Sequence, residues 1–319
     1  MFEFLITRPL GWVIQQIYNL VANYGVAIII FTILIKLVLL PLNIHSQKAM
    51  RKQQKIQPIL AELQEKYKND QEKLNREMMK LYKDNNISMM GGCLPMFIQM
   101  PILIGLYQVI QKPLSYFKGV DWMTQEVIDK VYMLRDAMAP HIGNLAQQTE
   151  EQLANMSQIQ LSKWAGIVNG ASDPWVINFN FLGLDLSTVP SEAFHYIMRL
   201  DFSDIGKVLL LLIPVLAVLM SLLTNKITTM QTGQNTKAAE NTQAGQMQKS
   251  MLWMMPVMSG FFTLTLPSGL GVYWIISSLM QIVQQLALNF YFDKKGEEVI
   301  VRVPEQKQIQ HGKKSKKRK

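Results

Sequence analysis

The chain has 319 residues, of which 49 % are hydrophobic and only 17 % are charged, whereas soluble domains carry about 25 % charged residues. With a mean hydropathy of +0.09, these values exclude an ordinary soluble globular protein and indicate an integral membrane protein. The single cysteine, Cys93, excludes an internal disulfide, and the four scattered histidines show no metal-ligand spacing. We therefore expect no metal and no cofactor.

Residues 1–23 predict an interfacial amphipathic helix. After Pro9, apolar residues recur on one helical face: Leu10, Val13, Ile14, Ile17 and Leu20. This pattern is typical of a helix that lies on the membrane surface. The segment carries an early acid, Glu3, and lacks the basic start and small-residue cleavage site of a signal peptide. The alternative, in which residues 2–20 extend the first span, remains open.

Residues 24–42, YGVAIIIFTILIKLVLLPL, form the first predicted span, because such a run is long enough to cross roughly 30 Å of hydrocarbon. Its one cation is Lys36, and a charge inside a span costs about 2.5–3.5 kcal/mol, so it is usually functional or able to reach water. Lys36 lies about 9 Å along a helix from Leu42, and its stem could snorkel to the interface. Thr32 lies one turn earlier on the same face.

Residues 43–87 predict a basic helical hairpin. They hold ten Lys/Arg and six Asp/Glu. Apolar residues recur at helical spacing over 56–63 and 74–81, and the polar residues 68–71 between these runs predict the turn. Such a hairpin buries little apolar surface, so its basic face could simply be solvated.

Four further apolar segments predict spans: 89–111, 207–224, 251–266 and 270–290. The first of them contains Gln99 together with glycines and prolines that allow close helix approach or break backbone hydrogen bonds. Residues 251–266 are short for a full crossing, and a Pro-Ser-Gly turn joins them to the last span. The predicted fold is an all-α membrane protein with five transmembrane helices.

The distribution of charge orients these spans. Five crossings place the termini on opposite sides, so the hairpin 43–87, the linker 225–250 and the tail 291–319 share one face. These three segments hold 23 of the 32 Lys/Arg, whereas the opposite loop, 113–206, holds 5 Lys/Arg and 11 Asp/Glu. Because Lys/Arg are enriched in cytoplasmic loops, we expect the N-terminus outside and the C-terminus in the cytoplasm.

The segments outside the spans differ in character. The extracytoplasmic loop 113–206 shows helical patterns near 123–139 and 145–164 and an extended aromatic piece at 175–186, so it is either a small subdomain or a cover on the membrane. Residues 231–246 are polar and of low complexity, which predicts a flexible linker. The tail ends in a polycation that predicts contact with lipid or ribosomal RNA: Lys313, Lys314, Lys316, Lys317, Arg318 and Lys319.

The sequence shows no nucleotide-binding glycine loop, no HExxH and no nucleophile elbow, so we expect no enzyme. What remains is a set of polar residues on apolar spans. Together with Lys36, residues such as Thr32, Gln99 and Ser221 could surround a water-filled recess. The alternative is that the small polar groups only join helices to one another.

Several strings resemble the YidC family of membrane protein insertases. They are FTILIKLVLLPL, GGCLPMFIQMPILIGLYQVI, FLGLDLS and LPSGLGVYWIISSLMQIVQQ, with the basic hairpin between the first two. The resemblance covers residues 24–112 and 176–292 in the family's order. It implies a five-helix core whose hydrophilic groove opens to the cytoplasm and to lipid and is closed on the outer side.

The resemblance also implies roles for single residues. Lys36 occupies the groove position at which the family generally has arginine, which keeps the charge but loses the planar guanidinium fork. Thr32 matches a threonine one turn earlier, and Tyr273 and Trp274 match an aromatic pair. The expected substrate groove comprises Lys36, Thr32, Gln99, Ser221, Tyr273, Trp274, Ser277 and Gln281. The outer loop departs from the family pattern through an insertion near 121–170.

The resulting hypothesis is an insertase and chaperone of the bacterial plasma membrane. Its expected partners are nascent membrane proteins and membrane lipids, with the ribosome and the Sec translocon as further candidates and no small-molecule substrate. A wet recess and a cation would lower the cost of desolvating a polar substrate segment. Two alternatives stay open: an anion or small-solute transporter, which would predict internal repeats, and a scaffold that tethers ribosomes.

Overall fold

The computed structural model describes residues 2–87, 94–122, 124–141, 157–198, 205–232 and 243–295. The first part of the chain forms a π-helical turn and four helices: η1 (Glu3–Thr7), α1 (Arg8–Val21), α2 (Tyr24–Val38), α3 (Leu40–Lys66) and α4 (Gln71–Asp84). The middle part follows as α5 (Leu94–Gln111), α6 (Pro113–Phe117), α7 (Gln125–Met138), α9 (Gln158–Asn169), β1 (Asn180–Phe181), β2 (Leu184–Asp185), η3 (Pro190–Glu192), α10 (Ala193–Met198) and α11 (Ile205–Leu209). The last three helices are α12 (Leu212–Thr232), α14 (Gln243–Thr265) and α15 (Ser268–Lys295).

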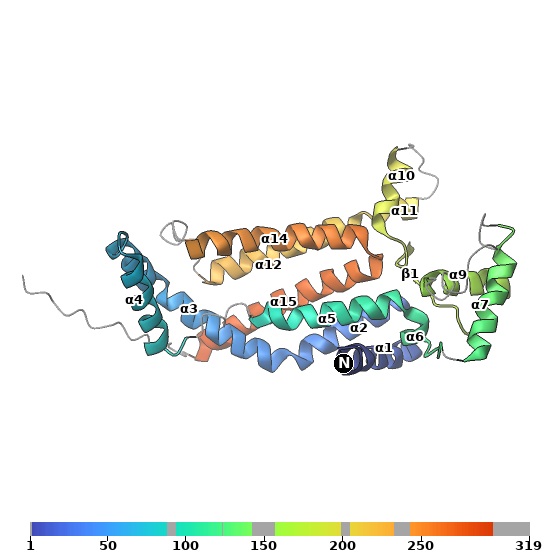
Figure 1. Ribbon diagram of the computed structural model, residues 1–319, viewed down its shortest axis with the longest axis horizontal. Coiled ribbons are helices and arrows are strands. Elements are labelled where there is room, and N and C mark those ends of the chain that lie inside the picture. Colours follow the sequence, from blue (N-terminus) through green and yellow to red (C-terminus); the bar gives the residue numbers. More distant parts are fainter. Residues whose placement is uncertain are drawn as a thin grey trace, which may run out of the picture.

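The long helices run side by side as a bundle, with α4 at one end and α7 and α9 at the other (Figure 1). In this bundle α12 packs against α14 and α15, and α15 also packs along α2. Glycine makes two of these crossings close. A Cβ atom on Gly271 would lie 2.3 Å from Ile213 Cγ2, and one on Gly269 would lie 2.7 Å from Tyr24 Cε1. Small residues of this kind let helix backbones approach in a membrane.

Two helical segments among the described residues are long and apolar enough to cross a membrane: Ile205–Met230 and Ser268–Phe292. A third crossing is possible if α2 and the start of α3, which meet at a bend of 58°, form one broken span. The chain is therefore a predominantly helical membrane protein of the all-α class, with two or three spans recognisable by length and composition. The count of five stays a prediction.

The predicted first span, 24–42, contains a break between two helices, and its extent as a membrane span stays a prediction. Helix α2 ends at Val38, and α3 begins at Leu40 and continues into the hairpin. The physical cause is Pro41, which has no N–H to donate to the carbonyl four residues earlier. Lys36 therefore lies in the last turn of α2, where the negative end of the helix dipole favours a cation.

The linker is shorter than predicted. Helix α12 continues to Thr232 and α14 begins at Gln243, so the ends of the expected flexible segment 231–246 are helical. Its central residues, 233–242, lie outside the described residues. At the other end of the chain α15 extends to Lys295, five residues beyond the predicted span.

The N-terminal helix is separate from the first span. Ala22 takes the left-handed conformation (φ 51°) and ends α1, and the Asn23 side chain then caps α2 by accepting from the Val26 N–H at 3.1 Å. The alternative of one continuous helix is therefore wrong. Helix α1 buries Ile14 and Ile17 against the bundle, while Leu20 is 86 % exposed. Its position on a membrane surface stays a prediction.

Helices α3 and α4 pack against each other as a hairpin. Their contact is a small apolar cluster of its own, formed by Ile56, Leu60, Leu81 and Ile87. Asp70 caps α4 by accepting from the Lys73 N–H at 3.0 Å. The turn at 67–70 lies one residue before its predicted position.

The described parts of loop 113–206 form a subdomain that shares the core of the bundle. Helices α7 and α9 contact each other, and Leu134 and Trp164 belong to the same buried cluster as Ile14 and Phe31. Gln158 joins α9 to α6 by accepting from the Ser115 N–H at 3.0 Å and donating to Ser115 Oγ at 2.9 Å. Residues 142–156, part of the second helical pattern, lie outside the described residues.

The segment after α9 closes the end of the bundle. The carbonyl of Asn178 accepts from the Tyr24 N–H at 3.0 Å, and the carbonyl of Leu186 accepts from the Gly269 N–H at 2.9 Å. These bonds satisfy N–H groups at the starts of α2 and α15, which have no partner inside their own helices. One short strap, including the antiparallel pair β1–β2, therefore holds both helix starts together.

Two carboxylates anchor this subdomain. Asp173 accepts from Lys130 Nζ at 2.8 Å, Asn169 Nδ2 at 2.7 Å and the Trp175 N–H at 2.7 Å. Burial raises the pKa of Asp173, but these hydrogen bonds outweigh burial and leave its pKa below the usual value. At Asp185 burial likewise raises the pKa, and the hydrogen bonds from Lys163 and Ser187 bring it below the usual value.

We expect acid to destabilise the subdomain. Because both folded-state pKa values are depressed, the stabilisation is present above the unfolded value of about 4 and is lost as the pH falls through the folded values. Tryptophan fluorescence during thermal unfolding, measured from pH 7 to pH 3, should show a falling midpoint. In the variant Asp173→Asn the unfolding midpoint should fall less between pH 7 and pH 3. An equal fall in the variant and the wild type would contradict the role of Asp173 in the acid sensitivity.

Candidate functional site

A chain of polar contacts crosses the bundle at the level of Lys36. The Lys36 side chain is 8 % exposed, and its Nζ donates to Gln99 Oε1 on α5 at 3.4 Å. Gln99 Nε2 in turn donates to the Tyr273 hydroxyl on α15, which also shares a hydrogen bond with Ser277. Four predicted groove residues from three helices, far apart in the sequence, are thus brought together.

The other predicted residues have different surroundings. Thr32 is fully buried, and its hydroxyl donates to the Ile28 carbonyl at 2.6 Å, so this proton is committed within α2. Ser221 is buried on α12, and Trp274 is half-buried, with its ring 6.3 Å from Phe262. Gln281 is exposed on α15. Among the described residues Gln281 forms no hydrogen bond with the Lys36 chain of contacts, and its place in the substrate groove stays a prediction.

Sequence reasoning missed Gln284. Its side chain is 9 % exposed, and its Nε2 donates to the Lys36 carbonyl at 2.9 Å while its Oε1 accepts from Asn43 Nδ2 at 3.0 Å. The available signal was a set of three glutamines in one apolar helix, an expensive pattern in hydrocarbon. Periodicity could not tell which of the three turns toward α2.

The electrostatics of the site follow from its neutral neighbours. Among the ion pairs of the described residues none involves Lys36, and its side-chain contact is an uncharged amide. A buried cation without a counter-charge is unfavourable, so the site is suited to receive an acidic group. The described residues hold no group of three or more His, Cys, Asp or Glu that could bind a metal.

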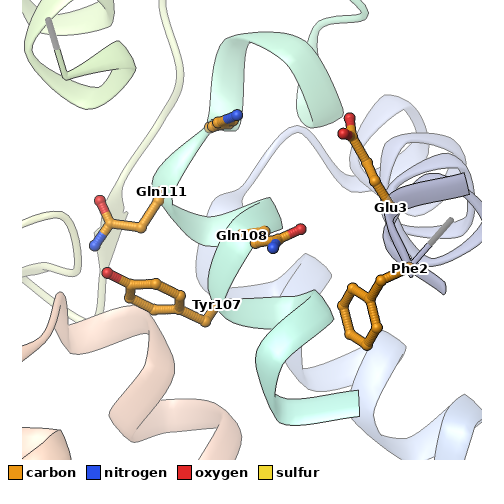
Figure 2. Close-up of a pocket in the computed structure, with 6 residues that line it drawn as sticks. Phe2, Glu3, Tyr107, Gln108 and Gln111 are labelled. Atoms are coloured by element: carbon orange, nitrogen blue, oxygen red, sulfur yellow. The ribbon is translucent and has the colours of Figure 1, made fainter. Parts of the chain in front are cut away.

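A cavity of about 570 Å³ lies elsewhere, between the N-terminal segment and α5. Figure 2 shows Gln108 between Phe2 and Glu3 on one side and Tyr107 and Gln111 on the other. Lys36 does not line this cavity. A wet recess around Lys36 therefore stays a prediction, as does the basic contact at 313–319, which lies outside the described residues.

Comparisons with known proteins agree with the resemblance in the sequence. The family model "60Kd inner membrane protein" matches residues 16–295. The chain is 31 % identical over 280 residues to a membrane protein insertase YidC of Nitratidesulfovibrio vulgaris, covering 88 % of the chain and 38 % of that relative. It is 30 % identical over 299 residues to a membrane protein insertase YidC 2 of Listeria innocua, covering 92 % of the chain and 74 % of the relative. The chain thus spans a little over a third of the length of the first of these relatives.

Proposed function

Since the chain belongs to the YidC family of membrane protein insertases, we propose that it inserts nascent membrane proteins into the bacterial plasma membrane and helps them fold. The observation that carries this proposal is the burial of Lys36 between three helices with uncharged partners. An insertase needs a place inside the membrane where a polar segment is less unfavourable than in lipid. A cation with neighbouring amide and hydroxyl groups supplies such a place.

The proposed mechanism is electrostatic and involves no covalent step. When an acidic substrate segment approaches Lys36, its carboxylates exchange hydration by water for attraction to the positive charge of Lys36. The low dielectric constant inside the bundle strengthens this attraction. Gln99, Tyr273 and Ser277 lie along the same contact chain and offer hydrogen bonds to polar backbone. The apolar helix of the substrate then moves sideways into lipid, favoured by about 0.8 kcal/mol for each buried CH₂ group.

The proposed topology has five crossings, with the N-terminus outside and both the α3–α4 hairpin and the tail in the cytoplasm. Two observations support it. Helix α4, which belongs to the basic segment 43–87, and helices α7 and α9, which belong to the acidic segment 113–206, lie at opposite ends of the bundle (Figure 1). The strap that joins the starts of α2 and α15 closes the end at which α7 and α9 lie, so the entry for substrate is at the hairpin end.

The proposed partners beyond substrate and lipid are the ribosome, contacted by the tail residues 313–319 and the hairpin, and the Sec translocon. The basic charge of the tail and the hairpin supports contact with an anionic surface. The Sec translocon is proposed on the family resemblance.

Reconstitution tests the proposed function. Vesicles of phosphatidylethanolamine and phosphatidylglycerol containing only this purified protein should insert a single-span substrate with an acidic outer segment, measured by protection of that segment from added protease. We expect protection several-fold above that in protein-free vesicles, because the buried cation lowers the cost of desolvating the segment. Equal protection with and without the protein would refute the proposal.

A further inference from the structure

The helix that carries Lys36 is broken directly after it. Helix α2 ends at Val38 and meets α3 at 58°. Helical hydrogen bonding resumes where the Asn43 N–H donates to the Leu39 carbonyl at 3.0 Å. A break of this kind leaves backbone carbonyls that need other donors in a membrane, and the angle across it depends on what supplies them.

One side chain from another helix binds both sides of the break. Gln284 of α15 donates its amide N–H to the Lys36 carbonyl, before the break, and its amide oxygen accepts from the Asn43 side chain, after it. Both distances, 2.9 and 3.0 Å, are those of ordinary hydrogen bonds. Because Gln284 is 9 % exposed, water competes poorly for these bonds.

Helix α3 is bound to α15 at a second point, near the middle of α3. Arg51 Nη2 donates to the carbonyl of Asn289 at 3.2 Å and to its side-chain oxygen at 2.9 Å. The Arg51 guanidinium also lies 4.9 Å from the centre of the Phe292 ring, and Lys48 Nζ lies 5.5 Å from it, both within range of a cation–π contact. Helix α15 therefore defines the direction of α3 from the break to the root of the hairpin.

We propose that Gln284 is a positioning residue that holds the bend between α2 and α3 and thereby directs Lys36 toward Gln99. This inference deepens the proposed function and rests on it only for the role of Lys36 in insertion. Gln284 acts through the main chain of the residue that bears the cation. Without its amide, the last turn of α2 loses the bond that fixes its rotation, and the 3.4 Å contact between Lys36 Nζ and Gln99 Oε1 is no longer held.

The neighbouring Gln285 offers a matched control. It is 2 % exposed and exchanges hydrogen bonds with Thr228 on α12, at 3.2 and 3.4 Å. This contact joins two helices through side chains and does not touch the break. If Gln284 were only a further helix–helix contact, Gln284→Met and Gln285→Met should have the same consequences.

The experiment measures the bend directly, without substrate. The full chain carries Cys93→Ala together with Leu34→Cys on α2 and His45→Cys on α3, two exposed positions. A spin label is attached to each new cysteine, and the distribution of distances between the two labels is recorded. Gln284→Met should broaden or shift this distribution, whereas Gln285→Met should leave it unchanged. Asn43→Leu removes only the hydrogen bond between Asn43 and Gln284 and keeps the one to the Lys36 carbonyl, so it should give a smaller change. It takes the place of Gln284→Met if that variant does not fold.

Insertion provides the second readout. Gln284→Met should lower insertion about fivefold, the factor that one lost hydrogen bond implies, and should have no further effect in a Lys36→Ala protein, because the two residues act in series. An unchanged distance distribution in Gln284→Met, or an equal change in Gln285→Met, would overturn the proposal. A changed distribution combined with full activity of Lys36→Ala would instead refute the role of Lys36 and leave the control of the bend intact.

Discussion

Replacing Lys36 by alanine should lower insertion of a substrate with an acidic outer segment by about tenfold or more, the factor expected for one charge-assisted hydrogen bond. The reason is that Lys36 is buried beside the uncharged Gln99. Removing Lys36 therefore removes the positive charge to which we assign the attraction for a substrate carboxylate. Protease protection in the reconstituted vesicles measures the effect.

Lys36→Arg should largely preserve insertion, because the charge remains and the guanidinium adds hydrogen-bond donors. Gln16→Ala is the control, since Gln16 is an exposed polar residue of α1 that lies outside the expected groove. A substrate with a neutral outer segment should lose much less activity with Lys36→Ala than the acidic one. Equal insertion of the acidic substrate by the wild type and both Lys36 variants would remove Lys36 from the mechanism.

Replacing Asp173 by alanine should destabilise the subdomain that contains α7 and α9 by about 3 kcal/mol, the effect typical of breaking a buried ion pair. The Asp173 side chain is 5 % exposed and pairs with Lys130 at 2.8 Å, while Lys130 Nζ lies 4.7 Å from the centre of the Trp175 ring. Alanine would leave the Lys130 ammonium, the Trp175 N–H and the Asn169 amide without this acceptor. Limited proteolysis should then cut near α7 and α9 at a lower denaturant concentration.

Asp136 supplies the control for this variant. It pairs with Arg135 at 2.6 Å, but its side chain is 65 % exposed, and exposed pairs contribute about 0–1 kcal/mol. Asp136→Ala should therefore resemble the wild type in the same proteolysis series. Similar resistance of Asp173→Ala and Asp136→Ala would show that the Asp173 contacts do not hold the subdomain together.

Much of the helical architecture was predictable from local patterns. Continuous apolar runs identified the helices that contain 207–224 and 270–290, because a helix that faces lipid must be apolar over its length. Two amphipathic runs separated by polar residues identified α3 and α4. The ends of helices were less predictable: the low-complexity segment 231–246 has helical ends, since composition does not show where neighbouring helices keep a polar segment ordered.

The candidate site was predictable in part. Lys36, Gln99, Tyr273 and Ser277 were expected in one groove and form one chain of contacts. Lys36, Gln99 and Ser277 were predictable because a polar group in a span needs a polar partner, whereas Tyr273 was expected from the family resemblance. Gln281 was included in the expected groove and Gln284 was not, although Gln284 is the one that contacts the Lys36 carbonyl. Which face of α15 meets α2 is decided by the packing of helices distant in sequence, and an apolar helix without a clear amphipathic pattern carries little information on that face.

The sequence by itself determined the class of the protein, its main apolar helices, the asymmetry of its charge and the presence of one cation in an apolar helix, because these follow from composition and from local periodicity. Only the tertiary structure decided the direction of α3, the burial of Lys36 and the contacts that surround it. The reason is distance along the chain: the hydrogen bond from Gln284 to Lys36 joins residues 248 positions apart, and such a pairing exists only once α2 and α15 have packed together.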